Sequence, residues 1–280
     1  DTIIAREGTK LGEYLRNLPA EKIYHPDVAT KTGATSDIGI ETAFAMFGIY
    51  EDGTVIDGTI IDKIANIPNP VPVIIGCNSK ELKMFLMMGL VKPEKLYKVI
   101  NNPSKFNKAS EIIGSIAVLG YERVAKEGQR VFENYGVLFT ADQLKKNNKA
   151  VYAYNFVWEN GTKPYDFLLG GSHAEDVPFL FGNFLPQGES LIGMMWESNN
   201  KSERETISKE MMAYWGSFAW YGDPNTSSGQ PLWQEYSDGK RLVIGKGNPY
   251  MTEVNEGSID LECPTCLIDG LLGSLAVSDS

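Results

Sequence analysis

The chain has 280 residues, 42% of them hydrophobic, and a formal net charge of −10. Such a composition indicates a globular protein with a sizeable core, at the upper edge of what one domain holds. The negative charge disfavours nucleic acid and anionic membrane surfaces as partners, because both bind clustered Lys and Arg. No apolar run approaches the ~20 residues of a membrane-spanning helix. We therefore expect no nucleic-acid partner and no membrane span, and a small neutral or cationic substrate suits the charge better.

A first short amphipathic helix is predicted within residues 9–23, where Thr9 can cap the start and Pro19 ends the pattern. Its apolar face would carry Leu11, Tyr14, Leu15 and Leu18.

Two segments far apart in the sequence have the character of buried parallel strands. Residues 70–76 form a short β-branched run closed by glycine, and residues 150–158 are rich in Val, Tyr and Phe. Residues 78–80 should form the loop after the first strand. About 70 residues of helical pattern lie between the strands, broken by Pro93, Pro103 and Gly120. That length fits a crossover connection with an additional helical layer.

The clearest helical pattern covers residues 202–221, opening on a Ser202 and Glu205 capping box and ending at Gly222. After it, residues 233–236 and 241–244 flank an Asp238-Gly239 turn, which predicts a β-hairpin at a sheet edge. The elements together predict an α/β fold with a mostly parallel sheet flanked by helices.

The cysteines give little support to a metal or redox site. Cys77 is alone, and Cys263 and Cys266 form a Cys-Pro-Thr-Cys run. A structural zinc site needs four ligands, and a redox dithiol normally opens a helix after a strand. We expect no metal and no cofactor, and interpret the pair as a local disulfide or two idle thiols.

Three Asn-X-Ser/Thr sequons, at Asn160, Asn200 and Asn225, predict surface turns. They matter only in a secreted eukaryotic protein, so the localisation stays unknown, with a secreted or extracellular protein as one interpretation.

The chain has two histidines, and they differ in their surroundings. His25 precedes Pro26 in a polar stretch without a carboxylate or thiol at ligand spacing, so we interpret it as a surface residue. His173 lies in a glycine-rich loop about 15 residues after the second predicted strand. Loops at the carboxyl ends of strands are where open α/β sheets hold catalytic groups.

Glu81 makes a catalytic role for His173 more credible than a structural one. It lies just after the first buried strand, so an acid and a histidine both follow strands, in that order. In α/β-hydrolases the triad residues run Ser, then Asp or Glu, then His along the chain. We therefore predict Glu81 and His173 as catalytic residues.

Four ordered sequence blocks resemble the C-terminal half of the type-B carboxylesterase and cholinesterase family, across nearly the whole chain. Residues 15–21 are similar to the family's Leu-Arg-x-x-Pro-Ala-Glu segment, and residues 71–81 to the strand followed by Gly-x-Asn-x-x-Glu. Residues 173–182 match His-x-x-[Glu/Asp]-x-Pro-[Phe/Tyr]-x-Phe-Gly. Residues 214–225 match Tyr-Trp-x-x-Phe-Ala-x-x-Gly-[Asp/Asn]-Pro-Asn, followed by Pro-x-Trp at 231–233.

The resemblance implies the C-terminal portion of a single α/β-hydrolase domain over residues 1–280, with a helical insertion between the acid and histidine strands. It implies a serine carboxylesterase in which Glu81 and His173 complete a Ser-His-Glu triad. The Gly-x-Ser-x-Gly elbow and the oxyanion-hole loop of the family are not in the sequence. The chain starts with Asp1 and shows no signal-peptide pattern, so we expect an upstream polypeptide of the same enzyme to carry the serine.

Ser190 offers a false nucleophile elbow in Gly-Glu-Ser-Leu-Ile-Gly, whose second glycine is one residue too far along. It also follows the histidine, which is the wrong order. Phe85 and Trp196 could line a substrate pocket, although core residues are the commoner interpretation of such aromatics. The ester substrate is not predicted, and a non-catalytic binding or adhesion domain of the same family is the alternative.

Overall fold

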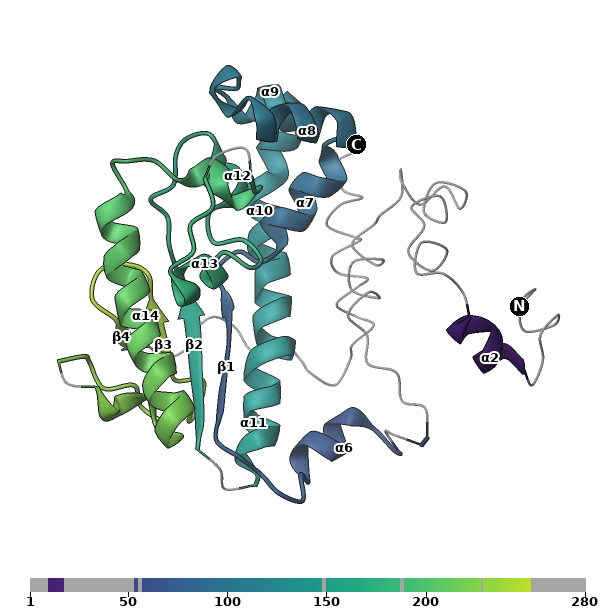
Figure 1. Ribbon diagram of the computed structural model, residues 1–280, viewed down its shortest axis with the longest axis vertical. Helices are drawn as coiled ribbons and strands as arrows, with labels where there is room; N and C mark the ends of the chain where they lie inside the picture. Colours follow the sequence, from purple (N-terminus) through teal and green to yellow (C-terminus); the bar gives the residue numbers. More distant parts are fainter. Residues whose placement is uncertain are drawn as a thin grey trace. The chain divides into compact units, whose positions relative to one another are not determined.

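The computed structural model describes residues 10–17, 53–54, 57–147, 150–186, 189–227 and 229–252 (Figure 1). The chain divides into two units, Asp1–Gly48 and Ile49–Ser280. In the first unit, helix α2 (Leu11–Arg16) confirms the middle of the predicted amphipathic helix. Its predicted ends, Thr9 and Pro19, lie outside the described residues, as do His25, Cys263 and Cys266.

The second unit contains a four-stranded sheet in the order β1-β2-β3-β4. The strands are β1 (Val73–Asn78), β2 (Val151–Phe156), β3 (Arg241–Ile244) and β4 (Tyr250–Thr252). The first three pair in parallel, and β4 is antiparallel to β3. The mostly parallel α/β arrangement predicted from the sequence is confirmed.

Strand β1 begins three residues later than predicted, because Pro70 and Pro72 have no N–H to donate to a neighbour. Pairing starts when the Val73 N–H donates to the Ala150 carbonyl at 2.9 Å. The strand continues to Asn78, a residue that was predicted to lie in the following loop.

The crossover between β1 and β2 is helical, as predicted. It contains α7 (Leu82–Leu90), α8 (Pro93–Asn101), η2 (Pro103–Lys105), α9 (Ala109–Ile113), α10 (Ser115–Phe132), the π-helical η3 (Glu133–Phe139) and α11 (Thr140–Lys145), and α6 (Ile60–Ala65) precedes β1. Pro93 and Pro103 occupy the first positions of new helices, where a missing N–H does no harm. The prediction that Gly120 breaks the helical pattern is wrong. Gly120 lies inside α10, because an interior glycine costs only about 1 kcal/mol.

After β2 come α12 (Tyr165–Leu169), α13 (Asp176–Phe181), η4 (Ile192–Met195), α14 (Lys201–Tyr221) and η5 (Pro224–Thr226). Helix α14 confirms the strongest helical pattern and ends at Gly222, which has a left-handed φ of 70°. The predicted Ser202 and Glu205 capping box is wrong. The helix starts one residue earlier, after Asn200, whose side chain accepts hydrogen bonds from the Glu197 N–H and Arg204 Nε.

The predicted hairpin is also wrong. The Asp238-Gly239 turn forms with positive φ at both residues, but residues 233–236 are not a strand. They lie across the start of β2, where the Tyr236 N–H donates to the Val151 carbonyl and the Trp233 indole to the Ala153 carbonyl. The hairpin that forms is β3–β4, so the sequence pattern located the turn and the strand of residues 241–244 correctly and the strand of residues 233–236 incorrectly.

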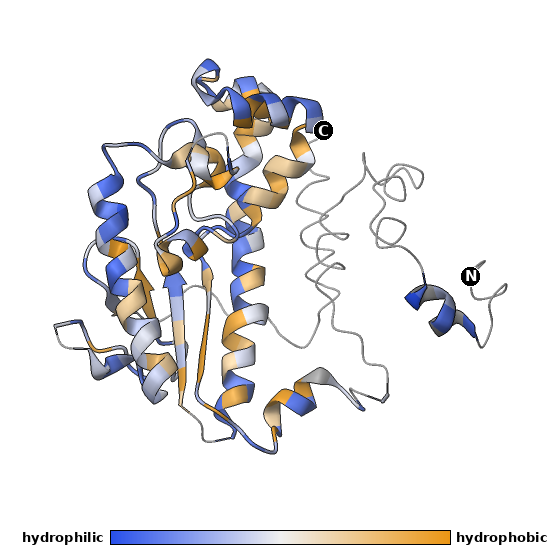
Figure 2. Ribbon diagram, in the orientation of Figure 1, coloured by the Kyte–Doolittle hydropathy of each residue, from blue (hydrophilic) through white to orange (hydrophobic). Residues whose placement is uncertain are grey.

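Alternating side chains of β2 face two different helical layers. Val151 and Ala153 pack with Cys77 of β1 and with Val137 and Ala141 of η3 and α11. On the other face, the Tyr152 ring contacts Phe218 of α14 at a centroid distance of 6.1 Å. The sheet is thus covered on both faces, which explains why most residues of β1 before Asn78 are hydrophobic (Figure 2).

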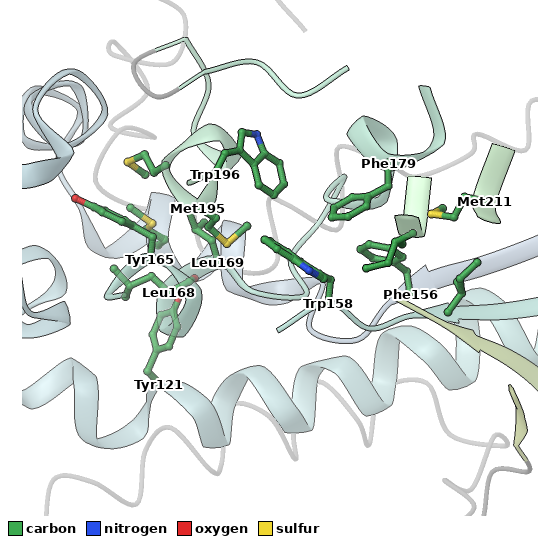
Figure 3. Packing of buried hydrophobic residues seen from close by; sticks show 14 of the residues in the cluster. Tyr121, Phe156, Trp158, Tyr165, Leu168, Leu169, Phe179, Met195, Trp196 and Met211 are labelled. Carbon is green, nitrogen blue, oxygen red and sulfur yellow. Dashed lines mark hydrogen bonds between the residues drawn. The ribbon is translucent and has the colours of Figure 1, made fainter. Parts of the chain in front are cut away.

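The largest core cluster extends beyond the carboxyl end of β2 (Figure 3). Trp158 is fully buried there, with ring centroids 5.3 Å from both Phe179 and Trp196. Phe156 contacts Phe179 at 4.9 Å. This aromatic cluster supports the loop and helices that follow β2 and thereby the segment that carries His173.

Replacing Gly76 by alanine is expected to lower the free energy of unfolding by about 1–3 kcal/mol, because the new methyl group overpacks the sheet. A Cβ at Gly76 would lie 2.1 Å from the Tyr154 ring. That ring is restrained by an edge contact with Trp215 at 4.9 Å and by its hydroxyl, which donates to Asp176 at 2.9 Å. Urea unfolding measures the change.

Gly216→Ala is the matched control, because nothing lies within 4 Å of a Cβ built there and the residue is inside α14. This variant should be about 0.5–1 kcal/mol more stable than the wild type. Equal stabilities for the two alanine variants would contradict the steric account.

Candidate active site

Hydrogen bonds with residues of β1 and α10 hold the side chain and the backbone of Glu81 in place. It follows β1 and occupies the N-cap position of α7. One carboxylate oxygen, Oε1, accepts from the Asn78 N–H at 2.7 Å, and the Glu81 N–H donates to Gln129 Oε1 of α10 at 2.9 Å. The residue is 5% exposed. Its carboxylate therefore has a fixed direction.

His173 lies in a tight loop between α12 and α13. Gly171 and Ala174 have positive φ values of 75° and 65°, which fold the chain sharply on either side of the histidine. The loop is attached to the turn that follows β1, because the Lys80 N–H donates to the Gly171 carbonyl at 2.7 Å. The Phe85 ring of α7 lies beside the imidazole, with centroids 5.1 Å apart. The loop and α7 thus fix the ring on two sides.

The two predicted residues meet, although 92 positions separate them in the sequence. His173 Nδ1 lies 2.7 Å from Glu81 Oε2, while the Glu81 side chain is 6% exposed and the His173 side chain 38%. A carboxylate beside Nδ1 favours the tautomer with the proton on Nδ1, which leaves Nε2 as the proton acceptor. This is the geometry of the acid and base of a hydrolytic triad, and the catalytic role itself remains a prediction.

The electrostatics of the pair follow from this contact. The hydrogen bond that His173 Nδ1 donates to Glu81 raises the pKa of His173 above its ordinary value of 6.5, against the opposing effect of burial. Asp176 adds a smaller upward contribution to that pKa. The imidazolium is therefore stabilised at this position, as a general base that accepts a proton requires.

The raised pKa of His173 predicts a pH-dependent contribution to stability. The folded protein binds the proton more tightly than the unfolded chain, so the contribution is fully present below the unfolded pKa of about 6.5 and is lost as pH rises through the raised folded value. Urea unfolding of the wild type and His173→Gln between pH 5 and 9 measures it. The stability difference between the two should shrink as pH rises, and a difference that grows with pH would contradict the assignment.

A second buried acid, Glu175, supports the histidine loop and was not predicted from the sequence. Its side chain is fully buried, and one carboxylate oxygen accepts from the Gly171 N–H. Burial raises the pKa of Glu175 well above its ordinary value. Glu175, two residues after His173, thus stabilises the loop through a hydrogen bond within it. Nothing in the sequence indicated this role, because an acid in a polar loop is normally exposed.

The remaining predicted positions have structural roles. Ser190 accepts a hydrogen bond from the Gly193 N–H at 2.8 Å, in the turn that begins η4, so it is not on a strand-to-helix elbow. Trp196 is 6% exposed and belongs to the core.

Two of the predicted sequons differ in exposure. Asn160 is exposed. The prediction of a surface turn is wrong for Asn200, which is 2% exposed and whose amide donates to the Met195 carbonyl.

The sequence profile of the Carboxylesterase family matches residues 120–260, half of the chain and the part that includes β2, His173 and α14. The chain belongs to the carboxylesterase family. Acetylcholinesterase of Gallus gallus is 34% identical over 110 residues, which are 39% of this chain and 13% of that protein. Carboxylesterase 1C of Mus musculus is 24% identical over 215 residues, 66% of this chain and 36% of that protein.

The fold of this carboxylesterase-family chain agrees with that of solved α/β-hydrolase carboxylesterases. The carboxylesterase EST55 of Geobacillus stearothermophilus superimposes with a TM-score of 0.53 and 22% identity, covering 91% of this chain and 50% of that one. The chain spans half of that structure and no more than 36% of the two curated relatives.

Metal sites and membrane spans are not found in the described ranges. No group of three or more His, Cys, Asp or Glu side chains there could hold a metal ion. Within those ranges, no helix has the length and apolar character that crossing a membrane requires.

Proposed function

We propose that this protein hydrolyses carboxylic esters through a Ser-His-Glu triad to which the chain contributes Glu81 and His173. The observation that carries the proposal is the 2.7 Å contact between His173 Nδ1 and Glu81 Oε2, in a chain of the carboxylesterase family. A buried acid that orients a half-exposed histidine is the arrangement that activates a hydroxyl nucleophile.

In the proposed reaction a serine hydroxyl attacks the ester carbonyl while His173 Nε2 accepts its proton. Glu81 keeps the imidazole in the required tautomer and stabilises the imidazolium that forms, without taking the proton itself. His173 then returns the proton to the leaving alcohol, and an acyl-enzyme results. Water, deprotonated by the same nitrogen, releases the acid. The proposed chemistry draws on no metal and no organic cofactor.

The proposed serine is outside these 280 residues. No Gly-x-Ser-x-Gly sequence occurs in them, and Ser190 caps the turn before η4. We propose that a further polypeptide segment of the same enzyme supplies the serine and the oxyanion-hole amides, and that residues 1–280 form the C-terminal part of one α/β-hydrolase domain. A small-molecule ester is the proposed substrate class.

A fluorophosphonate probe followed by peptide mass spectrometry tests the proposal on the full-length protein. The expected result is a single labelled serine that lies outside residues 1–280, together with hydrolysis of a short-chain aryl ester. A label on Ser190 would contradict the assignment of the nucleophile. Absence of both label and hydrolysis would favour a non-catalytic binding domain of the same family.

A further inference from the structure

Asn78, the last residue of β1, makes hydrogen bonds to both halves of the candidate site. It is 1% exposed. Its backbone N–H donates to Glu81 Oε1 at 2.7 Å. Its side-chain nitrogen Nδ2 donates to the Ser172 carbonyl at 2.8 Å and to Asp176 Oδ1 at 3.2 Å. One residue therefore contacts the catalytic acid and the segment on each side of the catalytic histidine.

The partners of the Asn78 amide are themselves fixed. Ser172 directly precedes His173 in the chain and is fully buried. Asp176 begins α13, and its other oxygen, Oδ2, accepts from the Tyr154 hydroxyl of β2 at 2.9 Å. The Asn78 amide thus ties the histidine loop to the rigid edge of the sheet, where the Glu81 carboxylate is also held.

The chemistry at this position requires a donor. Both groups that face Nδ2 are acceptors, a carbonyl and a carboxylate, and the amide oxygen Oδ1 of Asn78 has no hydrogen-bond partner among the described residues. Aspartate has nearly the same shape but would bring an acceptor against two acceptors, with the cost of an unpaired buried polar group. The donor capacity of the amide, rather than its volume, is what the site uses.

We propose that Asn78 is a positioning residue that sets the alignment of His173 with Glu81. The proposal rests on the proposed esterase function and adds to it a group that touches neither substrate nor nucleophile. Without the Asn78 amide, the histidine loop is anchored to the end of β1 by fewer hydrogen bonds, and the ring departs from the direction in which it meets both Glu81 and a serine. Small displacements of this kind reduce turnover strongly.

Asn78→Ala and Asn78→Asp in the full-length protein test the proposal with two measurements. The first is the pKa of His173 from the pH titration of its imidazole NMR signals, assigned with His173→Gln. In Asn78→Ala this pKa should fall toward 6.5, because the hydrogen bond with Glu81 is the largest cause that raises it. The second is kcat for an aryl ester on the pH plateau, expected to fall about 10²-fold in both variants, with Asn78→Asp at least as low as Asn78→Ala.

Asn155→Ala is the matched control. Asn155 is the neighbour on β2 that pairs with Cys77, it is half-buried, and its side-chain oxygen makes no hydrogen bond in the described part of the chain. It should leave the pKa of His173 and kcat within about twofold of the wild type, since substitutions that break no specific contact have small effects. If Asn78→Ala does not fold, the kcat of the isosteric variant Asn78→Asp tests whether Asn78 is a positioning residue.

An unchanged His173 pKa in folded Asn78→Ala, or wild-type kcat in Asn78→Asp, would overturn the proposal. A wild-type protein without esterase activity would refute the proposed function instead, and the NMR titration would still decide whether Asn78 aligns the pair.

Discussion

Replacing His173 by alanine is expected to lower kcat for ester hydrolysis by a factor on the order of 10³ or more while the protein remains folded. In the proposed mechanism the imidazole accepts the proton of the nucleophile and returns it to the leaving alcohol. Among the described residues, His173 is the side chain that pairs with Glu81 Oε2. Because the side chain is 38% exposed and lies in a loop, its removal leaves the aromatic core intact. Initial rates on an aryl ester and thermal unfolding of the same sample measure the two effects.

His25→Ala is the control, since it removes the other histidine of the chain and should keep wild-type kcat. Near-normal hydrolysis by His173→Ala would contradict the assignment of this residue as the general base.

Replacing Glu81 by glutamine is expected to lower kcat roughly 10²- to 10⁴-fold, as the loss of the orienting acid does in serine hydrolases. The glutamine amide can keep the hydrogen bond from the Asn78 N–H through its oxygen. It then offers an N–H to His173 Nδ1, where the carboxylate accepted one. The imidazole would hold its proton on Nε2, the nitrogen that accepts the serine proton in the proposed mechanism, so the favoured tautomer is the wrong one.

The pH profile of Glu81→Gln gives a second readout with a definite sign. His173 must be neutral to act as a base, so kcat/KM should rise with pH through its raised pKa. Replacing Glu81 removes the largest cause of the raised pKa of His173. The acid limb of the kcat/KM profile of the variant should therefore move to lower pH. Glu94→Gln, at an exposed position in the first turn of α8, is the control and should leave the profile unchanged. A limb that moves to higher pH would contradict the pairing.

The sequence alone identified the two residues that meet in the candidate site. Glu81 and His173 each follow a strand, and the parallel pairing of β1 with β2 brings the ends of both strands to one edge of the sheet. This could be read from the sequence because a β-branched run closed by glycine is a local signal, and because carboxyl ends of parallel strands share one edge. The apolar spacing also predicted the helix that the structure shows at residues 201–221.

Local signals failed where a more distant contact was stronger. Residues 233–236 have strand-like character, yet the hydrogen bonds of Trp233 and Tyr236 with β2 place them elsewhere. Gly120 is a helix breaker by propensity, and α10 continues through it because one face of that helix, with Tyr121 and Ala125, is buried. Such choices depend on which partners lie nearby in space.

The tertiary structure alone decided how the site is held together. The sequence determined that an acid and a histidine of the right types follow two parallel strands, because residue order and strand character are local properties. Burial of Glu175 and Asn78, the contact of Phe85 with the imidazole and the raised pKa of His173 come from elements more distant in the sequence or from the fold of the loop. These properties arise from desolvation and hydrogen-bond geometry, which exist only once the chain has folded.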